Sequence, residues 1–223
     1  MNGGIGMKMK YPDELIRRVN AELAGQQLEG LVTGRGPQHP QLMVVGEAPG
    51  RTEIETHVPF CGAAGKELTK SLATIGLRRD DVYITSVVRS RPYALKHVQD
   101  KRSGQIVEKR PNRPPTKREV RAFAPVFDWE VDQVVPQLIV TVGNTALQRL
   151  LGSRYTIGTV HGQLFVQPLQ RAANRLTGKY EPAPQPTPVI PLFHPAAVFY
   201  NRKLQPQIEA DWQRVAEYIA TGK

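Results

Sequence analysis

Residues 41–68, QLMVVGEAPGRTEIETHVPFCGAAGKEL, decide the fold of this chain. The apolar run 42–45 stops abruptly at Gly46, which predicts a buried strand that delivers a sharp loop to one edge of a sheet. Gly46 permits a positive φ or a close backbone approach. We expect an extended stretch from there to Phe60, followed by a helix. Bare backbone amides, the Glu47 carboxylate and the Phe60 ring suit a flat ligand with polar edges, such as a nucleobase.

Length and composition are typical of one α/β domain, residues 1–223, that buries a sizeable core. The sequence has no apolar run of membrane-spanning length. Residues 1–10 lack the apolar core of a signal peptide, and we expect them to form a flexible tail. The single cysteine, Cys61, excludes an internal disulfide and any all-cysteine metal site. We expect a cytoplasmic monomer.

The charge is strongly basic and unevenly distributed. Its formal net value is +10, from 30 basic and 20 acidic residues, which favours a polyanionic partner such as nucleic acid over a purely solubilising role. Residues 89–121, the basic segment, carry eleven basic and three acidic side chains, so +8 of this charge lies there. Ser103-Gly104 separates two β-compatible runs, which predicts a protruding hairpin over residues 93–111. The alternative is a solvated surface feature, but charge this concentrated favours phosphate contacts. The candidate phosphate-binding residues of the hairpin are Lys101, Arg102 and Arg110.

Hydrophobic periodicity predicts four buried strands that alternate with helices. Such alternation is typical of a three-layer α/β/α sandwich with a central four-stranded parallel sheet. The expected strands are 41–45, 82–88, 138–142 and 189–193, and the expected helices are 12–25, 64–75, 116–133, 144–151 and 206–220. We expect β-like stretches at 155–160 and 164–167, and a loop over 168–187. Residues that follow the carboxyl ends of parallel strands form the candidate site.

The sequence argues against a phosphate-binding loop and against a metal site, and it indicates one histidine as a candidate site residue. The run GAAGKEL resembles half of a phosphate-binding loop, but Glu67 stands where Ser or Thr is needed and Phe60 replaces the first Gly. The five histidines show no paired spacing, so no metal site is expected. His194 directly follows the fourth strand, and Pro195 fixes the turn after it. We therefore expect the imidazole of His194 to point into the strand-end cleft.

Seven motifs occur in the order found in uracil-DNA glycosylases. They are GEAPG (46–50), PFCGAAG (59–65), VYITSVVRSRP (82–92), NRPPTKRE (112–119), LIVTVGNTAL (138–147), HG (161–162) and FHPAAVF (193–199). Together they span roughly residues 40–200 and most resemble the family four type of that superfamily. The resemblance implies a monofunctional glycosylase that flips uracil out of single- or double-stranded DNA. Hydrolysis of the N-glycosidic bond would leave an abasic site for base excision repair.

The resemblance also implies a role for each matching residue. Backbone amides of residues 46–48 would hold the base, and Glu47 would position the attacking water, with Glu53 as the reserve candidate. Phe60 would stack on the flipped base, and His194 would lie near its O2 atom. The other base-binding and DNA-binding positions are Gly46, Ala48, Ser86, Arg91, Asn112, Arg113 and Pro195.

Two features depart from the family pattern. Family four enzymes hold an iron–sulfur cluster on four cysteines, whereas Ser90 and Phe123 stand at two of those positions, and residues before 41 supply neither of the others. We therefore expect no cofactor. Ser86 stands where the family usually has Asn to read the uracil edge, and its shorter hydroxyl would act through a bridging water.

Three alternatives stay open at this point. A glycosylase for hypoxanthine or xanthine would fit a relaxed reading of the base edge by Ser86. A DNA-binding module that keeps the fold without cleaving would fit Ser86 and the missing cluster cysteines. An enzyme acting on free nucleosides is disfavoured by the basic excess.

Overall fold

The computed structural model describes residues 7–100, 103–173 and 179–222. A seven-stranded sheet lies at its centre, in the order β1-β3-β5-β4-β9-β11-β10. The four middle strands are parallel where they pair, which confirms the predicted four-stranded parallel core. They are β5 (Tyr83–Ser86), β4 (Leu42–Gly46), β9 (Leu138–Val142) and β11 (Tyr180–Leu192).

Antiparallel strands extend the sheet at both edges. At one edge, β3 (Arg35–Gly36) pairs with β5, and β1 (Met7–Lys8) pairs with β3. The prediction of a flexible tail is therefore wrong for the strand β1, while residues 1–6 lie outside the described part of the chain.

The opposite edge corrects the predicted loop over 168–187. There β10 (Phe165–Ala172) pairs antiparallel with the first part of β11. The prolines of this segment favour a loop, but they recur at every second residue from Pro182 to Pro188. Proline lacks a backbone N–H, and alternate residues of a strand face the same edge, so the absent donors all lie on one edge of β11. The hydrogen bonds to β10 on the other edge are therefore kept.

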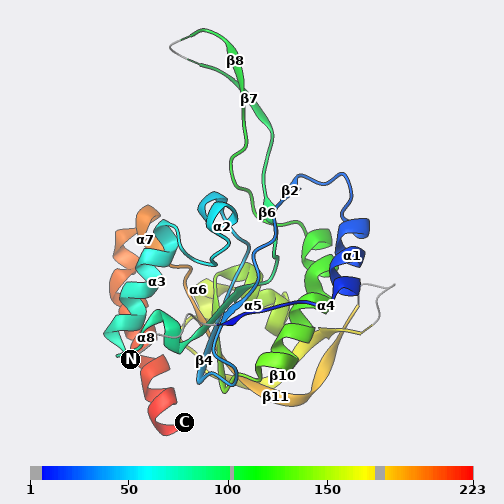
Figure 1. Ribbon diagram of the computed structural model, residues 1–223. Helices are drawn as coiled ribbons and strands as arrows, with labels where there is room; N and C mark the ends of the chain where they lie inside the picture. The colour runs from blue at the N-terminus through cyan, green and yellow to red at the C-terminus, as the bar shows by residue number, and fades with distance from the viewer. Residues whose placement is uncertain (1–6, 101–102, 174–178, 223) are drawn as a thin grey trace.

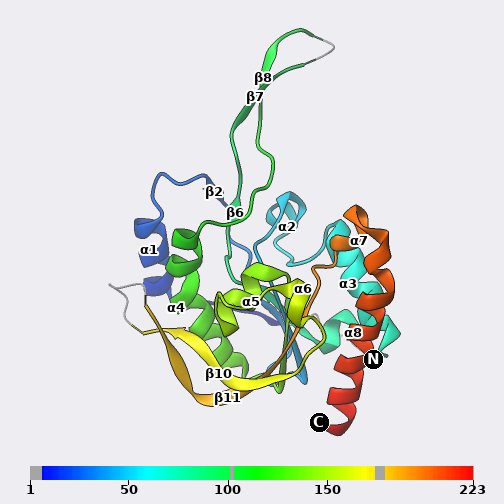
Figure 2. The same ribbon diagram turned by 180° about the vertical axis from the view of Figure 1, so that it is seen from behind.

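Helices cover both faces of the sheet, as Figures 1 and 2 show from opposite sides. Alternate residues of β4 enter different cores: Val44 packs in one cluster with Leu68, and Val45 packs in the other with Phe127. The three-layer arrangement follows from this alternation. The first face carries α3 (Ala63–Thr74) and α8 (Gln205–Thr221); the second carries α1 (Asp13–Glu22), α4 (Lys117–Val134) and α5 (Asn144–Leu151).

Short elements account for two further corrections. The stretch after residue 50, expected to be extended, contains α2 (Arg51–Thr56), and the β-like stretch near 155–160 contains α6 (Ile157–Val160). Helices of four to six residues are too short to show a 3.6-residue hydrophobic period. The remaining short helices are η1 (Arg79–Asp81), α7 (Ala197–Tyr200) and η2 (Arg202–Leu204). Among the described residues, no helix has both the length and the apolar character that a membrane span requires.

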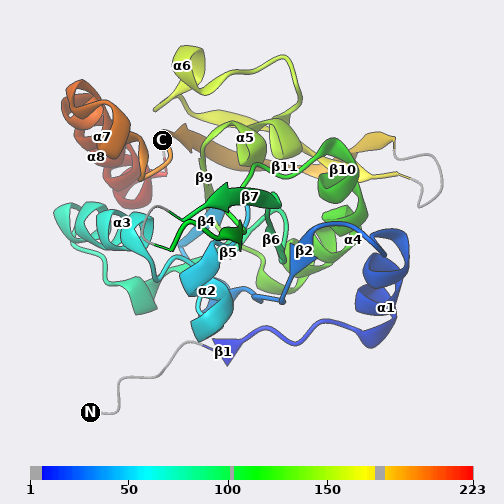
Figure 3. The same cartoon turned by 90° about the horizontal axis from the view of Figure 1, so that it is seen from above.

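The predicted hairpin within residues 93–111 is confirmed. Its strands, β7 (Lys96–Gln99) and β8 (Ile106–Lys109), pair antiparallel. The hairpin projects from the edge of the molecule where α2 lies, and the view from above places it over the middle of the sheet (Figures 1 and 3). At its base β6 (Arg91–Pro92) pairs with β2 (Leu28–Glu29). Lys101 and Arg102, two expected phosphate contacts, lie outside the described residues.

Candidate active site

Four of the predicted site residues meet at the carboxyl ends of the parallel strands. Gly46 and Ser86 are register partners in β4 and β5. A Cβ on Gly46 would collide with the Phe60 ring, so that ring lies directly against the strand end. The rings of Phe60 and His194 have centroids 5.9 Å apart and planes inclined at 35°. The site therefore combines a glycine backbone, an aromatic ring and an imidazole.

Ser86 belongs to the same face of the sheet as Phe60. Along β5, Ile84 faces the core that contains Phe60, and strand alternation places Ser86 on that side. Ser86 is only 6% exposed. Its hydroxyl has no hydrogen bond to any residue that the structure describes, so it is free to bond a ligand or a water.

Phe60 is held in an unusual backbone conformation. Its φ is +51°, a left-handed value that is uncommon for a residue with a side chain. Arg79 donates hydrogen bonds to the carbonyls of Pro59 and Phe60, the latter at 2.8 Å. Gly65 leaves room for the Phe60 carbonyl, because a Cβ there would overlap it. Arg79 and Gly65 therefore fix the backbone that carries the Phe60 ring.

Glu53 connects the 46–50 loop to the segment that carries Phe60. Its Oε2 accepts from the Gly50 amide at 3.0 Å, and its Oε1 accepts from the Gly62 amide at 3.1 Å. Both carboxylate oxygens are thus engaged by backbone donors. This geometry argues against Glu53 as the reserve group that positions water and gives it a structural role. Its sequence signal was an acidic residue three positions after the glycine that precedes α2.

The 46–50 loop keeps the amides of Glu47 and Ala48 available as donors. The carbonyls of Gly46 and Glu47 accept from the amides of Val87 and Val88 at 2.9 and 3.0 Å, which fixes the loop to the end of β5. Within the described residues, no hydrogen bond engages the amides of Glu47 and Ala48. Two neighbouring amides without partners at a strand end form a site for an anionic or carbonyl oxygen.

Thr145 orients the carboxylate of Glu47. Its hydroxyl donates to Oε2 of Glu47, whereas Oε1 has no partner among the described residues. Thr145 lies in the first turn of α5, directly after β9. Thr145 belongs to the LIVTVGNTAL motif, but no role is predicted for it from the sequence. The sequence signal was a hydroxyl residue two positions after the glycine that ends a buried strand.

The surroundings of His194 define its protonation. Its Nδ1 accepts a hydrogen bond from the Ala196 amide at 3.2 Å, so the neutral ring carries its proton on Nε2. Burial lowers the pKa of His194 below its ordinary value, although the Glu53 carboxylate opposes this shift. Gly143, with φ +91°, packs against the imidazole and would leave a Cβ only 3.5 Å from that of His194. Pro195 is buried, so it shapes this turn and presents no surface to DNA.

Several arginines of the basic segment are structural. Arg91, predicted to bind DNA, is 2% exposed and bonds Glu29, the Arg110 carbonyl and, at 2.5 Å, Oδ1 of Asn112. Arg89 is equally buried, against Glu130. The expectation that Arg91 contacts DNA is corrected, because a count of charges does not distinguish buried arginines from exposed ones.

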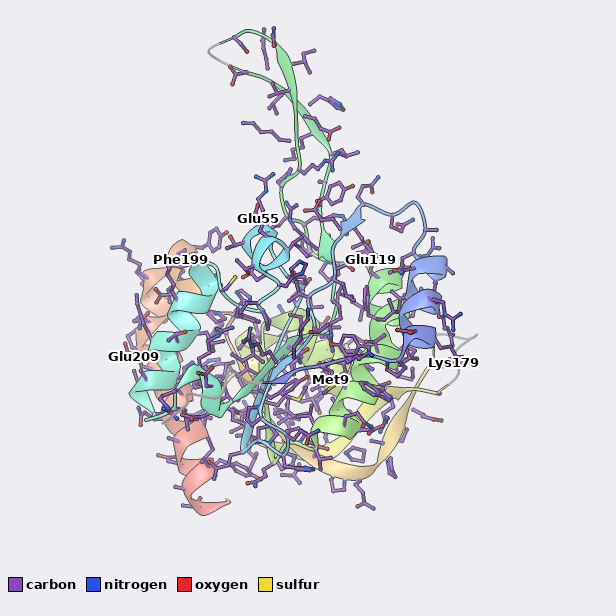
Figure 4. All side chains as sticks on the ribbon, in the orientation of Figure 1. Met9, Glu55, Glu119, Lys179, Phe199 and Glu209 are labelled. Atoms are coloured by element: carbon purple, nitrogen blue, oxygen red, sulfur yellow. The ribbon has the colours of Figure 1, made fainter. Side chains whose placement is uncertain are left out.

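Arg113, also predicted to bind DNA, is directed inward. It donates to both carboxylate oxygens of Glu119, at 2.9 and 2.6 Å, and to the Tyr93 carbonyl at 3.1 Å. Figure 4 marks Glu119 at the end of α4 that lies nearest the hairpin. Asn112 is exposed at the base of the hairpin, and Arg110 is exposed with Glu108 as its ion-pair partner at 2.8 Å.

An iron–sulfur cluster does not fit the residues of this chain. Cys61 is its single cysteine, and its sulfur lies 2.9 Å from the Thr56 hydroxyl. Phe123, at a position where a cluster would need a cysteine, is 1% exposed in the apolar core. Nor does the described part of the chain gather three or more histidine, cysteine or carboxylate groups in a metal-binding arrangement. The region is held instead by buried ion pairs such as Arg89–Glu130.

Comparisons with known proteins identify the family of this chain. A model described as the uracil DNA glycosylase superfamily matches residues 33–216. The chain is 34% identical over 197 residues to a type-4 uracil-DNA glycosylase of Sulfurisphaera tokodaii. The aligned stretch covers 86% of this chain and 76% of the relative. It is also 34% identical over 190 residues to the type-4 enzyme of Archaeoglobus fulgidus, covering 83% of this chain and 80% of the relative. The corresponding protein of Thermotoga maritima is 31% identical over 195 residues, or 87% of this chain and 84% of the relative.

Proposed function

This chain belongs to the uracil-DNA glycosylase superfamily, and from that premise we infer that it hydrolyses the N-glycosidic bond of uracil in DNA. The product is an abasic site, the substrate of base excision repair. The observation that carries the assignment of roles is the convergence of the 46–50 loop, Phe60 and His194 at one sheet edge. The roles that follow are our proposal.

Phe60 receives the flipped base. Extruding a base from a duplex costs a few kcal/mol, and stacking on an aromatic ring returns about 1–3 kcal/mol per base. The ring is well suited to this, because Arg79 fixes its backbone and Glu53 fixes the segment that follows it. The Phe60 side chain therefore loses little conformational entropy when the base enters.

Charge on the departing base is stabilised by three donors. As the glycosidic bond breaks, negative charge gathers on the uracil oxygens and the sugar becomes cationic. The amides of Glu47 and Ala48 and the Nε2–H of His194 donate to those oxygens, in the manner of an oxyanion hole. The lowered pKa of His194 and its bond from Ala196 favour a neutral imidazole in this role.

Glu47 positions the water that attacks the sugar. Thr145 occupies one carboxylate oxygen, which sets the orientation of the other toward a water. The carboxylate charge also offsets the cationic sugar in the transition state. Ala48 has no carboxylate, and both oxygens of Glu53 are engaged, so Glu47 is the best-placed acid in the loop.

The test of the function is release of base from defined oligonucleotides. Purified protein is incubated with DNA that contains one uracil, hypoxanthine or xanthine, and abasic sites are detected by strand cleavage with alkali. We expect release of uracil. Release of hypoxanthine or xanthine alone would support a glycosylase for another deaminated base, and tight binding without any release would support the non-cleaving module.

Ser86 governs how strictly the uracil edge is read. A Ser86→Asn variant places a donor and an acceptor directly at that edge, whereas the wild-type hydroxyl acts through a water. We expect the ratio of uracil release to hypoxanthine release, measured as kcat/KM, to rise in the variant. An unchanged ratio would show that Ser86 does not read the base.

Glu53 preserves the geometry of the stacking ring. A Glu53→Gln variant can accept from only one of the two amides, and a hydrogen bond to a charged group is worth about 1.5–3 kcal/mol. We expect KM for uracil DNA to rise by roughly tenfold or more, with a smaller change in kcat. The matched control is Glu55→Gln on the same helix, since Glu55 is exposed and pairs loosely with Arg51 at 3.8 Å. Equal effects in the two variants would contradict the role of Glu53.

A further inference from the structure

The two faces of the hairpin differ in charge. Cross-strand partners in an antiparallel pair share a face, and Lys96 lies directly opposite Lys109. Like charges opposite one another destabilise a β-pair, and neither lysine has an ion-pair partner among the described residues. The other face pairs His97 with Glu108. Folding of the hairpin does not explain the opposed lysines, whereas binding of a polyanion does.

The lysine face borders a groove that reaches α2, the helix next to the active-site loop. The groove has a volume of about 780 Å³, and its basic lining residues include Lys96, Lys109 and Arg110 of the hairpin and Arg51 of α2. Two carboxylates also line it, Glu29 and Glu108, and each is paired with an arginine. Arg51 directly follows the 46–50 loop. Asn112, at the base of the hairpin, would lie 3.2 Å from a Cβ on Gly50. A chain of phosphates leaving the active site can therefore enter this groove.

The base of the hairpin is held firmly. The Ala94 amide bonds the Pro111 carbonyl at 2.9 Å, and Tyr93 forms an isolated β-bridge with Asn112. The Tyr93 ring lies under the guanidinium groups of Arg91 and Arg110, at 6.0 and 5.3 Å. In Figure 4, Glu55 of α2 and Glu119 of α4 mark the elements on either side of this base. A preorganised element loses little conformational entropy when it binds.

The length of the hairpin indicates which strand it meets. Residues 93–99 extend roughly 20 Å at about 3.3 Å per residue, whereas the major groove of B-DNA is about 8.5 Å deep and admits a two-stranded β-ribbon. A DNA strand that lies over the 46–50 loop could be contacted by a much shorter hairpin. We propose that the Lys96–Lys109 face of the hairpin holds phosphates of the strand opposite the uracil, so that the protein prefers double-stranded DNA. This inference rests on the proposed glycosylase function.

The test compares single- and double-stranded uracil oligonucleotides. In the double variant Lys96→Ala, Lys109→Ala, we expect kcat/KM on duplex to fall roughly 10- to 100-fold, and the slope of log K against log salt to drop by about 1.8. Release from the single strand should stay near the wild-type value. The matched control is His97→Ala with Gln99→Ala on the opposite face, which should leave duplex cleavage unchanged.

Each other outcome of this test has a distinct meaning. Equal losses on single and double strands would overturn the proposal, because the lysines would then serve any phosphate chain. An unchanged duplex rate would overturn it as well. Wild-type protein that releases uracil from neither substrate would refute the glycosylase function itself, which separates the two failures.

Discussion

Replacing Glu47 by glutamine is expected to lower the single-turnover rate of uracil release by about 10²–10⁴, the usual range for loss of a positioned acid–base group. The amide keeps the shape of the side chain and can still accept the hydrogen bond of Thr145. It loses the negative charge that draws a proton from the water and offsets the cationic sugar. Binding of uracil DNA should change little, because the backbone amides and Phe60 remain.

A graded series separates the charge of Glu47 from its orientation. Thr145→Val removes the hydroxyl that bonds Oε2 while leaving the carboxylate in place. We expect a smaller loss of rate than in Glu47→Gln, with affinity preserved. A Glu47→Gln variant that released uracil at the wild-type rate would assign the water to another group, and Thr145 would then have only a packing role.

Replacing His194 by alanine should lower the rate by about 10²–10³, the cost of removing one oxyanion-type donor. The ring lies beside Phe60, and its Nε2 carries the proton because Nδ1 accepts from Ala196. The rate of His194→Ala is measured in single turnover, alongside binding of uncleaved DNA. A rate within a few-fold of wild type would remove His194 from the mechanism.

The pH dependence of the wild-type rate tests the neutral form of His194. Burial lowers its pKa, so the imidazole is neutral at pH values above the ordinary histidine value of about 6.5. Protonation at lower pH would place a proton on Nδ1 and break the bond from Ala196. We therefore expect no rise in rate as the pH falls from 8 through 6.5. A rise that disappears in His194→Ala would indicate a cationic histidine instead.

Much of the fold could be predicted because it depends on local pattern. The buried run in β4 and the Thr116–Glu119 cap at the start of α4 are signals within a few residues of each other. The location of Gly46 and His194 at the same edge of the sheet follows from a simple rule, that parallel strands end at one edge.

The missed features depend on contacts between distant residues. Glu53 engages Gly62 only because α2 turns the chain back, and Thr145 reaches Glu47 across 98 positions of sequence. Arg91 looks like a DNA contact in a count of charges, yet Glu29 from a distant strand buries it. Such partners are set by tertiary packing, and no local pattern encodes them.

The most direct test of the account measures abasic-site formation on uracil DNA by wild-type protein and by Glu47→Gln, in single turnover and with binding followed in parallel. We predict that both proteins bind the uracil oligonucleotide with similar affinity, and that the variant forms abasic sites at least a hundredfold more slowly. Wild-type protein that binds without releasing uracil, or a variant as fast as wild type, would contradict the account.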